Sequence, residues 1–177
     1  PALTDFVIAT RQASHMFVTG PDVVRAVTGE QISAEDLGGA RIHGSVSGVV
    51  HYVAEDEEDA LGQVRSFLAY LPSSAEVDAP LYAYDDTDAQ ADAEAARSVG
   101  EIVPASTRQA YDVVEVVSAV VDHGELVQVQ EEFAANVVVG FACFEGHPVG
   151  IVANQPLVDA GTLDVDASEK LARFVRF

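Results

Sequence analysis

Residues 136–154 read NVVVGFACFEGHPVGIVAN and contain two apolar runs separated by a short polar break. Both runs, 136–144 and 148–154, are rich in valine and other residues that favour strands. The three residues between them, 145–147, have the length and the glycine of a hairpin loop. The sequence therefore predicts a β-hairpin, in which the only cysteine, Cys143, is packed inside and is not a reactive thiol.

Helices and short strands are predicted on both sides of this hairpin. Helices are expected from Pro21, from the capping residues 33–36, over 61–71, over 111–121 and after a cap at 166–169. Strands are expected at 6–9, 15–18 and 48–54. This mixture of elements indicates an α/β protein.

Residues 73–104 contain few large apolar side chains and many Asp, Ala, Ser and Pro, so we interpret them as an acidic linker. The Asp-rich start of residues 86–97 resembles a calcium-binding loop. Such a loop needs glycine at its sixth position and glutamate at its twelfth, where this chain has Ala91 and Arg97. We therefore expect no calcium site, and two parts of the chain, 1–72 and 105–177, on either side of the linker.

The charged side chains are strongly unbalanced, with nine Lys and Arg against 29 Asp and Glu and a formal net charge of −20. This charge repels phosphate, which excludes charge-driven binding to nucleic acid and to anionic membrane surfaces. Hydrophobic residues make up 49% of the chain, so the acidity does not indicate disorder. Lysine occurs only at Lys170, and the composition indicates either adaptation to high salt or an ordinary acidic protein from a GC-rich genome.

Common catalytic motifs are missing from the sequence, among them a P-loop, a dinucleotide fingerprint and HExxH. Residues 44–48 have the spacing of a nucleophile elbow, but Val46 stands where that motif needs serine. The histidines show no metal-ligand spacing, and we expect His43 and His51 to be structural. No apolar run approaches the roughly 20 residues of a membrane span. The first residues lack the basic start and apolar core of a secretory signal, so we expect a cytoplasmic protein.

Several longer segments resemble one protein family. They are FVTGPDVV at 17–24, LGGARIH at 37–43, SGVVH at 47–51, LAYLPS at 68–73, VGIVANQP at 149–156 and ASEKLARFVR at 167–176. The first three look like the end of a crotonase-fold core. Taken together, the segments resemble the carboxyltransferase (β) subunit of propionyl-CoA and related acyl-CoA carboxylases, with the weakest similarity in the linker.

The resemblance implies an α/β fold of the crotonase (ClpP/crotonase-like) superfamily. Residues 1–72 would end the N-terminal carboxyltransferase domain, and residues 105–177 would begin the C-terminal one. The implied activity transfers a carboxyl group from carboxybiotin to the α-carbon of propionyl-CoA, with acetyl-CoA and longer acyl chains as rivals. The biotin would be carried by a partner biotin carboxylase or carrier subunit, the coenzyme A thioester would be the substrate, and no metal is implied. Hexamers of this subunit are usual in the family.

In this family, backbone N–H groups at glycine-rich helix starts stabilise the enolate-like oxyanions of the reaction. The resemblance places both of these glycine pairs outside residues 1–177, and we expect both ends of the chain to be interior points of a longer protein. No catalytic residue is therefore expected here, and no carboxylation by this chain alone. The rival hypothesis is a crotonase-like paralogue that serves oligomer assembly or carrier docking without turnover. The sequence beyond both ends distinguishes the two.

The resemblance also implies which residues lie near the acyl-CoA or biotin cleft. They are Asn154, Gln155, Gly20, Pro21, Gly38, Gly39, Ser47 and Gly48. For the first two, the alternative is a turn whose amides satisfy its own backbone. For the glycines, helix ends and strand packing are equally good explanations. Lys170 and Arg173 either assist an anionic CoA or complement the dipole of the last helix.

A part of such an assembly exposes apolar surface that belongs against partners. We therefore expect the 177-residue chain to aggregate in dilute buffer at low salt. Light scattering measures this directly, and a monodisperse monomer under those conditions would contradict the expectation.

Overall fold

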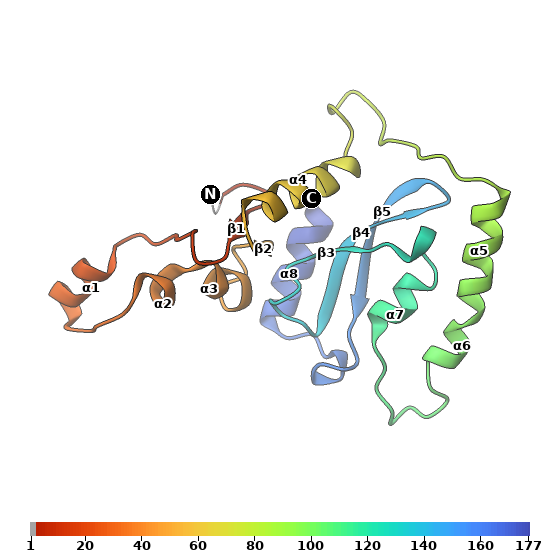
Figure 1. The fold of residues 1–177 in the computed structure, drawn as a ribbon. Coiled ribbons are helices and arrows are strands. Elements are labelled where there is room, and N and C mark those ends of the chain that lie inside the picture. The colour runs from red at the N-terminus through yellow and green to blue at the C-terminus, as the bar shows by residue number, and fades with distance from the viewer. Residues whose placement is uncertain (1–2) are drawn as a thin grey trace. The chain divides into compact units, whose positions relative to one another are not determined.

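The computed structural model describes residues 3–177 and divides into two compact units. The first unit takes the chain up to Val64, together with Gln130–Phe133. The second unit contains Arg65–Val129 and Ala134–Phe177. Figure 1 labels the elements of both. No helix of the described residues is both long enough and apolar enough to cross a membrane.

The first unit is built around two short parallel strands, β1 (Ile8–Thr10) and β2 (Tyr52–Ala54). Three helices lie between them in the chain, namely α1 (Pro21–Thr28), α2 (Ala34–Gly38) and α3 (Ala40–Ser45). The core consists of Val7, Ala9, Ala40 and Val50, with Met16 and Val53 packed against it. The imidazole Nδ1 of buried His51 accepts a hydrogen bond from the Val7 N–H, which ties the two strand segments together.

The predicted helix starts of the first unit are confirmed. Pro21 opens α1, and the Ser33 side chain accepts a hydrogen bond from the Asp36 N–H at the start of α2. Gly39 follows the last residue of α2, as expected. The strand predicted at 15–18 is wrong, because only His15 forms an isolated bridge, with Gly39.

The second unit contains an antiparallel sheet of β3 (Val127–Val129), β4 (Val137–Phe144) and β5 (His147–Asn154), with β4 in the centre. The predicted hairpin is confirmed, since β4 and β5 pair along their whole length around the loop at Glu145. The first six residues of β4 are buried. A strand buried on both faces needs cover on both sides of the sheet.

Helices α7 (Val113–Ser118) and α8 (Val165–Arg176) lie on opposite sides of this sheet (Figure 1). On the α7 side, Val117, Val121 and Ala142 form a buried cluster. On the α8 side, the Phe141 ring lies 5.1 Å from the Phe174 ring and 5.5 Å from that of Phe67, between ring centroids. Phe67 comes from α4 (Glu57–Ala69), which begins in the first unit and continues in the second. The amphipathic helix predicted over 61–71 is therefore confirmed, although it begins earlier, at Glu57 among the acidic residues.

The segment expected to be a linker contains two helices, α5 (Asp86–Arg97) and α6 (Val99–Ile102). The acidic pattern considered for calcium is a helix start instead. The Asp85 side chain accepts from the Asp88 N–H, and the Asp88 side chain accepts from the Asp85 N–H. Within the part of the chain that the structure describes, no group of three His, Cys, Asp or Glu side chains could hold a metal ion.

The two units meet in sequence between residues 64 and 65, whereas the domain boundaries at 72 and 105 stay a prediction.

Two other boundaries differ from expectation. Helix α7 has six residues instead of the eleven of 111–121, and Ala119 caps its C-terminus. Helix α8 begins at Val165, since the side chain of Asp164, not a residue of 166–169, accepts from the Ala167 N–H. Two short 3₁₀ turns, η1 (Asp122–Gly124) and η2 (Asp159–Gly161), complete the unit.

Gly48 and Gly62 form a matched pair for testing the packing. Gly48 has φ +63°, and a methyl group there would lie 2.6 Å from the Phe133 ring, whereas a methyl group at Gly62 in α4 meets nothing within 4 Å. We expect Gly48→Ala to lower the free energy of unfolding by about 2–3 kcal/mol, through backbone strain and overpacking. Gly62→Ala should raise it by up to about 1 kcal/mol, because alanine favours a helix. Urea denaturation measures both values, and an equal effect of the two substitutions would contradict the close packing at Gly48.

Candidate functional site

Two of the predicted glycine segments meet at one aromatic ring in the first unit. A methyl group at Gly38 would lie 3.1 Å from the Phe17 ring, and one at Gly20 would lie 3.6 Å from it. The methyl group at Gly38 would also collide with the Met16 carbonyl oxygen. Glycine at position 38 is therefore explained by close backbone packing. Gly20 is under no such constraint.

The peptide groups of these glycines serve the fold. The Gly38 carbonyl accepts a hydrogen bond of 2.8 Å from the Met16 N–H, and the Gly39 N–H donates over 2.9 Å to the Glu35 carbonyl. The Gly20 carbonyl accepts from the N–H groups of Val23 and Val24 in the first turn of α1. Because the Gly39 N–H already has a partner, it is not available as a donor to an oxyanion.

Ser47 is joined to the same region through a histidine. The Ser47 hydroxyl lies 2.9 Å from His43 Nδ1, and His43 Nε2 lies 2.6 Å from the Met16 carbonyl oxygen. A carbonyl only accepts hydrogen bonds, so His43 Nε2 carries a proton and donates to the Met16 carbonyl. Ser47 is thus joined to Met16 through the His43 ring. His43 serves as the structural hydrogen-bonding residue that we expected.

The turn at Gly48 is fixed by a hydrogen bond from a distant segment of the chain. Its carbonyl accepts a hydrogen bond of 2.6 Å from the side-chain Nε2 of buried Gln130, in a segment 82 residues away. This long-range bond holds the turn in place, while the positive φ and the close approach of the Phe133 ring explain why the residue is glycine. No sequence pattern indicated Gln130 as its partner.

In the second unit, Gln155 uses both ends of its side-chain amide within the fold. Its Oε1 accepts from the Val113 N–H at 3.1 Å, and its Nε2 donates to the Asp112 carboxylate at 2.6 Å. The Asp112 carboxylate also caps α7 by accepting from the Val114 N–H. Gln155 is 7% exposed, and its amide fixes the start of α7 beside the end of β5.

Asn154 stabilises the turn that follows it. Its Nδ2 donates over 2.6 Å to the Gly161 carbonyl, and Asn136 makes the corresponding bond of 2.7 Å to the Thr162 carbonyl. Three successive residues in η2, 159–161, have left-handed φ values of 46°, 54° and 69°. Such a backbone persists only where neighbouring groups hold it. The Asn154 bond is of the kind that the turn alternative describes, whereas the Gln155 amide bonds to the start of α7 instead. Contact of Asn154 or Gln155 with a ligand stays a prediction.

Lys170 has a different environment from the one expected for a phosphate-binding cation. It is 2% exposed, and its Nζ donates over 2.7 Å to the Val137 carbonyl and over 3.3 Å to the Ala134 carbonyl. The side chain therefore joins α8 to the beginning of β4. Since a buried ammonium group cannot reach a ligand at the surface, the interpretation of Lys170 as a CoA contact is wrong. Sequence reasoning lacked any signal for this, because lysine on a helix is usually exposed.

The family model for the carboxyl transferase domain matches residues 1–177. The propionyl-CoA carboxylase carboxyltransferase subunit of Haloferax mediterranei is 51% identical over 100% of this chain and 34% of its own length. The methylmalonyl-CoA decarboxylase subunit alpha of Veillonella parvula is 48% identical, again over 100% of this chain and 34% of its own. Among solved structures, the hexameric transcarboxylase 12S with bound methylmalonyl-coenzyme A is 41% identical, with a TM-score of 0.90 over 99% of this chain and 33% of that one.

The chain spans about a third of the length of these relatives. The match nevertheless covers both units and includes all six segments that carried the resemblance. On this evidence the chain belongs to the carboxyl transferase domain family and has its crotonase-like fold.

Proposed function

We propose that this chain is part of an enzyme component that moves a carboxyl group from carboxybiotin to the α-carbon of an acyl-CoA. The observation that carries the proposal is the match of the family model to the whole chain. The Haloferax relative, named a propionyl-CoA carboxylase subunit, favours propionyl-CoA as the substrate and methylmalonyl-CoA as the product.

The chemistry needs hydrogen-bond donors for the oxyanion that forms when the α-carbon becomes nucleophilic. Among the candidate glycines, Gly39 is poorly suited to this task, because its N–H already donates to the Glu35 carbonyl. We infer that the donors belong to the rest of the protein. In this proposal Gly20 and Pro21, beside Phe17, supply part of the wall that positions the acyl-CoA.

The partners follow from the same proposal. Biotin would arrive on a carrier domain of a partner biotin carboxylase subunit, and the full-length protein would form a homo-hexamer, as transcarboxylase 12S does. A cytoplasmic location is part of this proposal. The net charge of −20 would be screened in a salty cytoplasm, where binding of an anionic CoA depends on local donors.

The activity is tested with the full-length protein, its biotin-carrying partner, ATP and labelled bicarbonate. We expect incorporation of label into propionyl-CoA to exceed that into acetyl-CoA and butyryl-CoA, in a salt series that also reveals the working ionic strength. The 177-residue chain assayed in the same way should incorporate no label, because it lacks the oxyanion donors. Label incorporation by the isolated chain would overturn the placement of those donors. No turnover by the full-length protein, with glycine-rich oxyanion motifs absent beyond the ends, would favour the non-catalytic paralogue.

Gly20→Ala tests the proposed wall of the acyl-CoA site. The added methyl group meets only an ordinary contact of 3.6 Å with Phe17, and Gly20 has φ −74°, so the fold accommodates alanine. If acyl-CoA lies against Gly20, the full-length variant should show a KM for propionyl-CoA raised about tenfold, the scale of one methylene in a fitted pocket. The melting temperature should not change. Gly62→Ala is the control, and equal KM values for the two variants would remove Gly20 from the site.

A further inference from the structure

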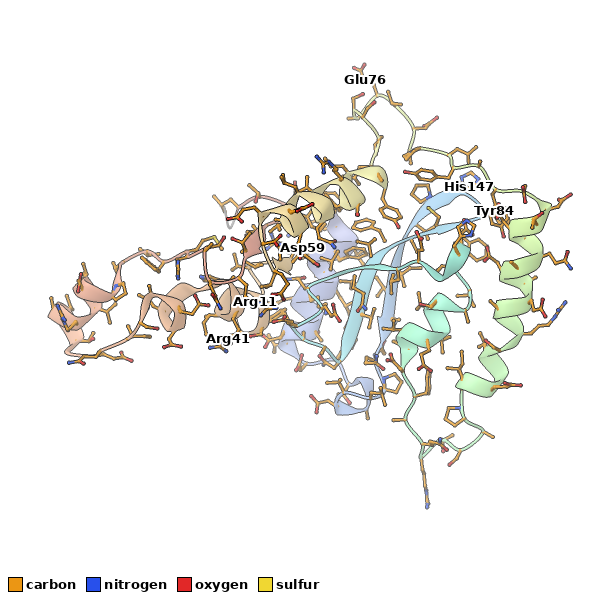
Figure 2. All side chains as sticks on the ribbon, in the orientation of Figure 1. Arg11, Arg41, Asp59, Glu76, Tyr84 and His147 are labelled. Atoms are coloured by element: carbon orange, nitrogen blue, oxygen red, sulfur yellow. The ribbon has the colours of Figure 1, made fainter. Side chains whose placement is uncertain are left out.

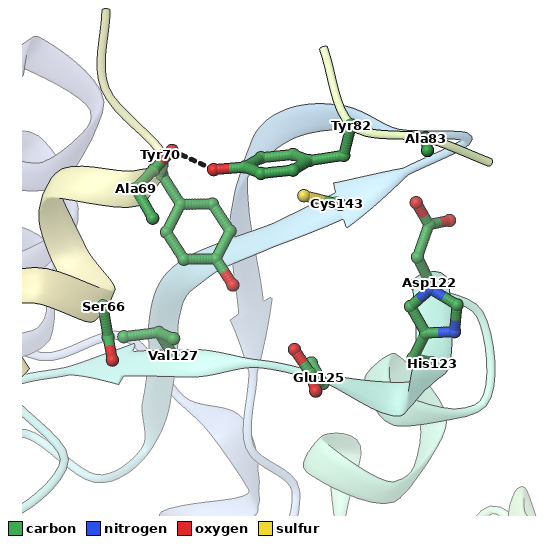
Figure 3. A pocket seen from close by; sticks show the side chains of 10 residues that line it. All are labelled: Ser66, Ala69, Tyr70, Tyr82, Ala83, Asp122, His123, Glu125, Val127 and Cys143. Atoms are coloured by element: carbon green, nitrogen blue, oxygen red, sulfur yellow. Dashed lines mark hydrogen bonds between the residues drawn. The ribbon is translucent and has the colours of Figure 1, made fainter. Parts of the chain in front are cut away.

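The second unit contains a pocket of about 550 Å³ that no sequence pattern predicted. Its lining residues are Ser66, Ala69, Tyr70, Tyr82, Ala83, Asp122, His123, Glu125, Val127 and Cys143. They come from the end of α4, the segment before α5, η1, β3 and the end of β4. Figure 3 shows the two tyrosine rings near one end, Asp122 and His123 near the other, and Cys143 between them.

The two tyrosine rings of this pocket are held by bonds within the unit. The Tyr82 hydroxyl donates over 2.5 Å to the Ala69 carbonyl, and the Tyr82 N–H donates over 2.9 Å to the Gly146 carbonyl. The Tyr70 ring lies against the Phe141 ring, with 5.9 Å between centroids. Both aromatic faces are thus positioned before any ligand binds.

Two carboxylates from different elements give the pocket its charge. The Asp122 side chain is 6% exposed and accepts hydrogen bonds of 2.8 Å and 2.7 Å from the N–H groups of Glu145 and Gly146. Glu125, which follows η1, contributes a second negative charge to the wall. The residues described as lining the pocket include no Lys and no Arg to balance these charges.

The pKa values of the Cys143 thiol and the Tyr70 phenol depend on burial and on the nearby negative charges. Burial raises the pKa of the Cys143 thiol, and the carboxylates of Asp122 and Glu125 raise it further. Burial also raises the pKa of the Tyr70 phenol, with additional effects from Cys143 and Glu125. Burial disfavours charge of either sign, whereas the part of these shifts that comes from the carboxylates reports a negative potential, which favours a cation in the same place.

We propose that this pocket binds an alkyl cation, with a guanidinium or ammonium group between the tyrosine rings and the carboxylates of Asp122 and Glu125. Aromatic faces attract such cations, and the carboxylates supply matching charge and hydrogen-bond acceptors. The apolar stem of the ligand would lie along Ala69, Ala83 and Val127. The site needs no carboxyl transfer and is independent of the proposed function.

Cys143 allows a direct measurement, because it is the only cysteine of the chain and lies in the pocket. Two methanethiosulfonate reagents are compared, one with a cationic trimethylammonium-ethyl group and one with an anionic sulfonatoethyl group. The rate at which each modifies Cys143 is divided by the rate at which the same reagent modifies a small free thiol. The raised pKa slows both reagents equally, so the ratio reports the local potential. We expect the cationic reagent to be favoured about tenfold or more. Glu125→Gln should reduce this preference, whereas Glu169→Gln, an exposed residue of α8, should leave it unchanged.

Occupancy is tested by protection of Cys143 from uncharged iodoacetamide. In the full-length protein, with the Cys143 peptide followed by mass spectrometry, agmatine at about 10 mM should slow this reaction at least threefold and should slow it less in Glu125→Gln, while 1,5-pentanediol and glutarate should have no effect. A short peptide with one central arginine distinguishes a protein side chain from a free small molecule as the source of the cation. Protection by agmatine or by the peptide supports the site. Absence of protection by both, even with a preference for the cationic reagent, would overturn it, as would equal rates for the two charged reagents.

Discussion

The second unit depends on one constraint, which is that β4 is apolar on both faces. Its residues alternate between two sides of the sheet, so that Phe141 and Ala142 must each find a different set of neighbours. Helix α7 covers the Ala142 side, while α8 and the end of α4 cover the Phe141 side. The polar bonds of the unit then secure these layers, and the buried ammonium group of Lys170 ties α8 to the first residues of β4. Even the end of β5 serves this arrangement, because Gln155 fixes the start of α7.

Much of the fold was predictable because it follows from local periodicity. The runs 136–144 and 148–154, separated by a glycine-containing loop, specify a hairpin with little help from the rest of the chain. Helix α5 was missed for the opposite reason. None of its residues is buried, so it has no apolar stripe, and it forms through alanine content and the reciprocal cap of Asp85 and Asp88. Helix α7 ends early, after six residues, although valines continue beyond it.

The candidate site was less accessible to sequence reasoning. A motif such as VGIVANQP identifies a family, but it does not say which partner each amide has. The bonds of Gln155 to Asp112 and of Asn154 to Gly161 depend on how the end of β5 meets its neighbours. The partners of Gly48 and Lys170, Gln130 and Val137, lie 82 and 33 residues away in sequence, and only the folded chain brings them together. Gly38 differs, because its close approach to Met16 is what glycine at a helix end commonly permits.

The hairpin loop at Glu145 and Gly146 has a consequence for the order in which the second unit assembles. The Gly146 carbonyl receives the N–H of Tyr82, and the N–H groups of the loop reach the carboxylate of Asp122. These contacts join segments more than 20 residues apart, so each closes a long loop whose entropy must be overcome. A hairpin, by contrast, forms from neighbouring residues on the microsecond scale, about 1–10 μs. The hairpin is therefore expected to form before η1 and the segment at Tyr82 dock against its loop.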